Sequence, residues 1–167
     1  MKRLALKNIK HSEFNSQETN CFKSDIYFDN KKVAYCHNDG RGGSTHFSYY
    51  PGQEELFKEM EEYCHSLPSA EYGDTPLEMD LELVVGDILE EWLMNQEKNK
   101  FLKKLEKNFD RGICYGKKED YTVMFFEGGG KRVTIKEMCK SEAGRNCIAK
   151  ACEKLVKDGH TILNTNI

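Results

Sequence analysis

The first third of the chain alternates between apolar and polar positions, which is the pattern of half-buried β-strands. A short extended segment is predicted over residues 4–9, and further strands over 21–28 and 32–37. Asp29-Asn30 is predicted to form the two-residue turn between the last two. The apolar side chains that share one face of the strand at 21–28 are Phe22, Ile26 and Phe28.

The middle of the chain changes to a helical period. Apolar residues recur at i, i+4 and i+7 over about 52–66, and residues 66–74 then read as a loop. A second helix is predicted from Thr75 to Met94, with Thr75 as N-cap and Pro76 in the first turn. Its apolar stripe consists of Leu77, Leu81, Val84, Val85, Ile88, Leu89 and Trp92.

The last third returns to extended segments. Strands are predicted over 113–115, 121–127 and 131–137, and three consecutive glycines form the turn between the second and the third. Ser141 is predicted to cap a final helix that ends near Lys157.

The order of these elements predicts an α+β fold. Polar residues 95–100 interrupt the central helical region, which continues as a bent extension or as a second helix. Antiparallel strands at both ends of the chain therefore pack against a central group of two to three helices and a C-terminal helix. A length of 167 residues predicts a single domain, 1–167.

The charges are unevenly distributed along the chain, although the net charge is only −3. Residues 51–97 contain one basic and fourteen acidic side chains, whereas residues 98–118 contain eight basic and two acidic ones. The basic stretch can lie against the acidic helices or contact the phosphates of a nucleic acid. We favour the first, because its aromatic residues have helical spacing and are expected to pack inward.

Several classes of protein are not indicated by the sequence. The N-terminal residues lack the apolar region of a secretory signal, and no segment is apolar enough to span a bilayer. The seven cysteines are odd in number and include no C-x-x-C pair, so a reducing cytoplasm is expected, with neither disulfides nor a structural zinc ion. No motif indicates a cofactor.

A glycine-rich loop is the strongest candidate for a binding site. Its glycines can adopt positive φ and direct successive N–H groups toward a phosphate or carboxylate, and Arg41 supplies a planar cation. The loop matches neither the Walker A pattern nor the dinucleotide-binding pattern, and an ordinary turn is the alternative. The candidate ligand-binding residues are Asn38, Asp39, Gly40, Arg41, Gly42, Gly43, Ser44 and His46.

Three segments together carry a resemblance. These are LKNIKH at 6–11, ET-x-CF at 18–22 and the N-D-G-x-G-G loop at 38–43. They are similar to segments of small uncharacterised proteins carried by bacteriophages and plasmids, over about the first 45 residues. The resemblance implies an accessory protein of a mobile element, for which interference with host functions is a common role.

Two hypotheses for the function remain open. The first is a small cytoplasmic accessory protein of a phage or mobile element that binds without catalysis, either to a host or phage protein or to a small anionic ligand. The absence of nucleophile and metal-hydrolase motifs favours it. The alternative is an enzyme that acts on a nucleotide or phosphate ester through the loop at 37–46, with His37, Asp39, Arg41 and His46 around it.

Overall fold

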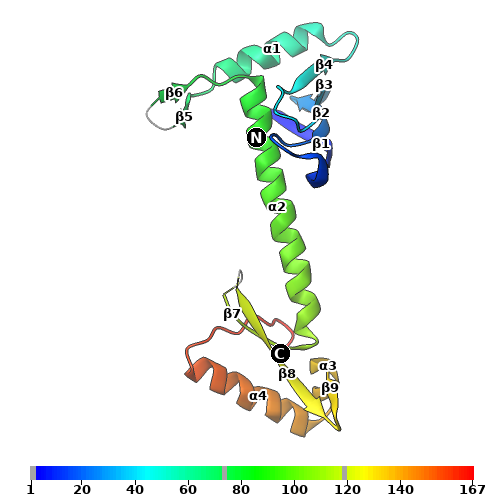
Figure 1. Cartoon of the computed structure of the whole chain (residues 1–167), viewed down its shortest axis with the longest axis vertical. Helices are drawn as coiled ribbons and strands as arrows, with labels where there is room; N and C mark the ends of the chain where they lie inside the picture. The colour runs from blue at the N-terminus through cyan, green and yellow to red at the C-terminus, as the bar shows by residue number, and fades with distance from the viewer. Residues whose placement is uncertain (1–2, 73–74, 118–119) are drawn as a thin grey trace. The chain divides into compact units, whose positions relative to one another are not determined.

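The computed structural model describes residues 3–72, 75–117 and 120–167 (Figure 1). Contacts within the chain group it into two compact units, Met1–Met94 and Asn95–Ile167, each with its own core. The single domain 1–167 therefore stays a prediction, and each unit is described by itself. Within the described ranges, no helix combines the length and the apolar character that crossing a membrane requires.

The first unit contains a four-stranded antiparallel sheet in the order β1-β2-β3-β4. The strands are β1 (Leu4–His11), β2 (Phe22–Phe28), β3 (Lys31–Asn38) and β4 (His46–Tyr49). The predicted turn between β2 and β3 is confirmed, since Asp29 and Asn30 both have positive φ, 45° and 65°. The sequence pattern did not predict β4, a short edge strand that follows the glycine loop.

Two helices cover one face of this sheet. They are α1 (Glu54–His65) and the N-terminal part of α2 (Leu81–Phe109), and Figure 1 shows both beside the sheet. The predicted inward face of β2 is confirmed, because Phe22, Ile26 and Phe28 are buried. The helix side chains buried against the strands in the same core are Met60, Cys64, Leu81, Val84, Val85 and Leu89. The intervening residues of β2, which are Lys23, Asp25 and Tyr27, are not part of this core.

A β-bulge in β1 changes which side chains face the helices. Asn8 has φ 55°, and the pairing register with β2 shifts by one residue between Lys7 and Lys10. Because of this extra residue, Ile9 packs against the core and Lys10 lies opposite Lys23. The Asn8 amide donates to an Asp25 carboxylate oxygen at 2.8 Å, which holds the bulge to the neighbouring strand.

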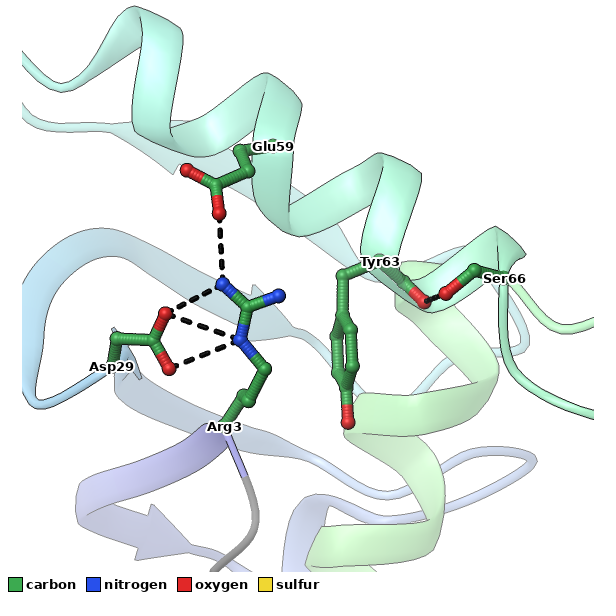
Figure 2. Close-up of polar contacts among 5 residues, drawn as sticks. All are labelled: Arg3, Asp29, Glu59, Tyr63 and Ser66. Carbon is green, nitrogen blue, oxygen red and sulfur yellow. Dashed lines mark hydrogen bonds and ion pairs between the residues drawn. The ribbon is translucent and has the colours of Figure 1, made fainter.

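Arg3 connects three parts of the first unit, as Figure 2 shows. Its guanidinium donates to Asp29 in the β2–β3 turn at 2.6 Å and to Glu59 of α1 at 2.7 Å. The same group lies over the rings of Phe28 and Tyr63, 4.3 and 5.0 Å from their centroids. Its hydrogen bond to Arg3 lowers the pKa of Asp29. Arg3 thus links the start of β1 to the turn and to α1.

The second unit contains a three-stranded antiparallel sheet in the order β7-β8-β9, together with short and long helices. Ile113, Ile135, Ile148 and Leu155 form the buried core of one cluster, and Leu105, Phe109 and Cys114 form another. The predicted cap of the last helix is confirmed, because the Ser141 hydroxyl accepts a hydrogen bond from the Gly144 amide at 3.0 Å. The elements are β7 (Gly112–Gly116), β8 (Tyr121–Gly128), β9 (Lys131–Val133), α3 (Ile135–Met138) and α4 (Glu142–Lys157).

The predicted start of the central helix is wrong. Thr75 belongs to β6 (Thr75–Leu77), which pairs with β5 (Ala70–Tyr72), and α2 begins at Leu81. The Asp80 carboxylate accepts a hydrogen bond from the Leu83 amide at 2.8 Å and thereby caps the helix. The loop predicted for 66–74 therefore contains β5, and its last two residues lie outside the described residues. Thr75 and Asp80 are both good N-cap residues, and packing against the sheet selects the second.

Two further boundaries differ from the prediction. Residues 95–100 do not interrupt the helix, because α2 is continuous from Leu81 to Phe109 and polar residues such as Gln, Glu and Lys are good helix formers. The strand predicted over 131–137 ends at Val133, where a capping box formed by Thr134 and Glu137 starts α3. The overall class is nevertheless confirmed as α+β, with antiparallel sheets and helices.

The core of the first unit predicts a large effect of truncation at Leu89. This side chain is 2% exposed, so Leu89→Ala is expected to lower the free energy of unfolding by about 2–5 kcal/mol. Met94 lies on the same helix and is 65% exposed, and Met94→Ala is expected to change it by less than about 0.5 kcal/mol. Urea unfolding measures both. Equal midpoints for the two variants would contradict the packing described here.

The cysteines are expected to react in an order set by burial. Desolvation raises the pKa of Cys36 to about 12 and that of Cys64 to about 11, whereas Cys147 is exposed on α4. Since the thiolate is the reactive form, an alkylating reagent at pH 8 should label Cys147 first and the two buried thiols only after unfolding. Peptide mass spectrometry measures the order. Early labelling of Cys36 in the native protein would show that the covered face of the sheet is open.

Candidate functional site

A buried asparagine organises the glycine-rich loop between β3 and β4. Asn38 is the last residue of β3 and is only 6% exposed. Its side-chain oxygen accepts hydrogen bonds from the Gly40 amide at 2.8 Å and from the Thr19 hydroxyl at 2.9 Å. Its side-chain nitrogen donates to the Gly43 carbonyl at 2.8 Å. One buried side chain therefore satisfies both ends of the loop and ties it to the segment before β2.

Gly40 is required by its surroundings as well as by its backbone conformation. It has φ +85°, and a Cβ placed on it would lie 2.3 Å from the Asn15 carbonyl oxygen. Its own carbonyl accepts from the amides of Gln17 and Glu18, at 2.9 and 3.1 Å. Gly43, in contrast, has no positive φ and no atom within 4 Å of such a Cβ. The fold therefore requires glycine at position 40 but not at position 43.

The amides of the loop point largely toward groups of the protein itself. The Arg41 amide donates to the Asp39 carboxylate at 3.2 Å, and the Thr45 amide donates to the Glu82 carboxylate of α2 at 2.5 Å. A carboxylate of the chain thus occupies the place beside Thr45 where an external anion would be held. The surrounding negative charge favours a cationic neighbour over an anionic one. Anion binding by the loop stays a prediction.

The predicted site residues divide between two environments. Asn38 and Gly40 are buried and hold the loop, whereas Arg41 and Ser44 are exposed. The other predicted residues of the loop, Asp39, Gly42 and Gly43, are exposed as well. His46 is an exposed residue of β4 and belongs to the sheet rather than to the loop. Burial thus separates the two residues that hold the loop from the six that are exposed to the solvent.

A groove of about 430 Å³ lies between this loop and the N-terminal part of α2. Asn38, Gly43 and Thr45 form part of one wall. Apolar side chains from β2, from β6 and the segment after it, and from α2 contribute to the rest. These are Phe22, Leu77, Met79, Leu83 and Leu89. The sequence predicts the loop as a candidate site, but it does not predict that this face of α2 lies beside the loop.

The charged residues that line the groove are all acidic. Glu82, Asp87 and Glu90 line it, and no lysine or arginine among the described residues does. Asp87 and Glu90 are exposed and have no ion-pair partner within the described part of the chain. Three carboxylates beside apolar side chains can attract an ammonium or guanidinium group whose carbon stem lies on the apolar surface.

A glycine within α2 leaves space in this groove. Gly86 lies in the interior of the helix, where glycine is less favourable than alanine by about 1 kcal/mol. A Cβ at this position would meet no other atom within 4 Å, so packing does not require glycine here. The missing side chain instead leaves the helix backbone accessible from the groove.

Sequence reasoning missed the contribution of α2 to the site. The spacing of Asp87 and Glu91 predicts a shared helix face, and this pattern is typical of a solvated flank of the helix rather than of an acid/base pair. The available signal was Gly86, an isolated glycine in the middle of a strongly apolar helical stripe. Its proximity to the loop depends on the Thr45–Glu82 contact, which joins residues 37 positions apart.

The structure also bears on metal binding. Within the ranges that the structure describes, no three His, Cys, Asp or Glu side chains are grouped so that they could hold a metal ion. Cys36 is buried and His37 exposed, as expected for neighbours on a strand.

Comparison with protein-family models, curated proteins and solved structures finds no match to this chain.

Two glycine substitutions test which glycine of the loop the fold requires. Gly40→Ala is expected to lower the free energy of unfolding by more than about 2 kcal/mol, because the methyl group would collide with backbone at a positive φ. Gly43→Ala is the matched control and should leave it unchanged or slightly higher. Thermal and urea unfolding measure both. Similar stability of the two variants would show that Gly40 is not held as described.

Proposed function

We propose that the protein is a non-catalytic binding protein, and that the groove between the glycine loop and α2 receives a basic segment of a partner protein. The observation that carries this proposal is the composition of the groove, whose lining in the described part of the chain consists of apolar walls and three carboxylates, with no basic residue. A lysine or arginine side chain can place its stem over the gap at Gly86 and its charge near Asp87 and Glu90.

The proposal extends to the biological context. The resemblance of the first 45 residues to small phage and plasmid proteins supports a host or phage protein as the partner. Interference with that partner's function would then follow from occupation of its basic segment. The alternative enzyme at residues 37–46 gains less support, because Asn38 and Asp39 are engaged in holding the loop and His46 lies in β4.

A synthetic peptide tests the proposal. The probe is a fluorescein-labelled peptide of alternating leucine and arginine, and fluorescence anisotropy gives its Kd for the purified protein. The double variant Asp87→Lys/Glu90→Lys is expected to weaken binding roughly tenfold to a hundredfold, since hydrogen bonds to charged groups contribute about 1.5–3 kcal/mol. Gly86→Met should weaken binding by filling the groove, while its higher helix propensity maintains the fold.

Two controls make the result specific. Glu55→Lys reverses an exposed acidic residue on α1 that does not line the groove, so it should change the Kd less than about twofold. A peptide with aspartate in place of arginine should not bind. If Glu55→Lys weakens binding as much as the groove variants do, the attraction is general and the proposed site is wrong. Failure of the wild-type protein to bind the basic peptide would overturn the proposal.

A further inference from the structure

The uncovered face of the four-stranded sheet carries a row of basic and imidazole side chains. The pairing register places Lys10 opposite Lys23, Lys23 opposite His37, and His37 opposite His46. The row contains one residue from each of β1, β2, β3 and β4, so it crosses the whole sheet. With neighbouring strands about 4.8 Å apart, it extends about 14 Å. All four residues are exposed.

The stability of the sheet does not account for this row of side chains. Like charges directly opposite each other on neighbouring strands are destabilising, and Lys10 and Lys23 are such a pair. Among the described residues, neither ammonium has an ion-pair partner. The acidic residue of the adjacent row, Asp25, already interacts with Asn8, Lys32 and Tyr50. The two lysines therefore present uncompensated positive charge to the solvent.

Aromatic rings lie beside these charges on the same face. The ring centroids of His37 and His46 are 5.1 Å apart with an interplanar angle of 25°, and those of Tyr35 and His37 are 5.7 Å apart at 29°. The three rings thus form a nearly parallel run across β3 and β4. A hollow of about 340 Å³ beside it is lined by Tyr35, His37, Lys10 and Lys23, among others. Flat rings therefore lie next to cationic groups.

We propose that this face, formed by Lys10, Lys23, Tyr35, His37 and His46, binds single-stranded nucleic acid. Unpaired bases stack on the exposed rings of His37 and His46 and on the half-buried ring of Tyr35, and the two lysines contact neighbouring phosphates. An inorganic anion would use the lysines but not the rings. A duplex keeps its bases stacked within itself and so gains nothing from the rings. The surface is distinct from the acidic groove and from the basic stretch at 98–118, so the inference does not depend on the proposed function.

The test uses fluorescein-labelled 15-mers of deoxythymidine and of uridine and a 15-base-pair DNA duplex, with anisotropy as the readout. The wild-type protein should bind the single strands at least tenfold more tightly than the duplex. The two single strands distinguish DNA from RNA as the ligand. With two phosphates neutralised, the logarithm of the association constant should fall with that of the salt concentration with a slope of about −1.4.

Variants then separate stacking from charge. Tyr35→Leu and His37→Ser should each weaken binding about fivefold to a hundredfold, whereas Tyr35→Phe keeps the ring and should bind like the wild type. The double variant Lys10→Gln/Lys23→Gln should bring the salt slope close to zero. The matched control is Lys103→Gln/Lys104→Gln, which removes two exposed lysines from α2 and should leave the affinity unchanged. Circular dichroism checks that each variant is folded.

Three outcomes would overturn the inference. These are no binding of either single strand at 50 mM salt, equal affinity for the duplex, and a loss of affinity in Lys103→Gln/Lys104→Gln that matches the loss in Lys10→Gln/Lys23→Gln. The last outcome would locate the binding in the basic stretch instead. The groove variant Asp87→Lys/Glu90→Lys should retain binding of the single strands, so failure of this inference and failure of the proposed function are distinguishable.

Discussion

The burial of one face of the four-stranded sheet is the constraint on which the first unit depends. Side chains alternate between the two faces of a strand, so packing α1 and α2 against Phe22, Ile26 and Phe28 directs the intervening residues to the other side. Lys23 and Asp25 therefore lie on that side. The same constraint requires the bulge at Asn8, because the spacing from Leu4 to Ile9 cannot otherwise direct both apolar side chains inward.

The glycine loop shows how a buried polar group can connect a sheet to a binding surface. Asn38 satisfies the backbone at both ends of the loop, and the Thr45 amide then donates to Glu82 on α2. That contact positions the loop beside a helix face rich in carboxylates. A motif whose composition suggests an anion site is thereby brought into an environment that favours a cation.

The net charge of the chain does not describe the charge of its individual surfaces. A net charge of −3 indicates no strong field, yet the first unit contains a groove lined by three carboxylates and a sheet face on which Lys10 lies opposite Lys23. The two surfaces suit ligands of opposite charge. Each surface combines charge with apolar or aromatic side chains, which can add to the affinity for a ligand.

Local patterns in the sequence determined the α+β class, the inward face of β2, the turn at Asp29-Asn30 and the cap at Ser141. The turn, the cap and the strand face each depend on residues within a few positions of one another, so short-range sterics and hydrogen bonding specify them, and the class follows from the order of such local elements along the chain. The start of α2 at Leu81, the groove at Gly86 and the row from Lys10 to His46 were decided only by the tertiary structure. They depend on register and on contacts between distant residues, such as Thr45 with Glu82, and periodicity along the chain contains no information about which distant segments meet.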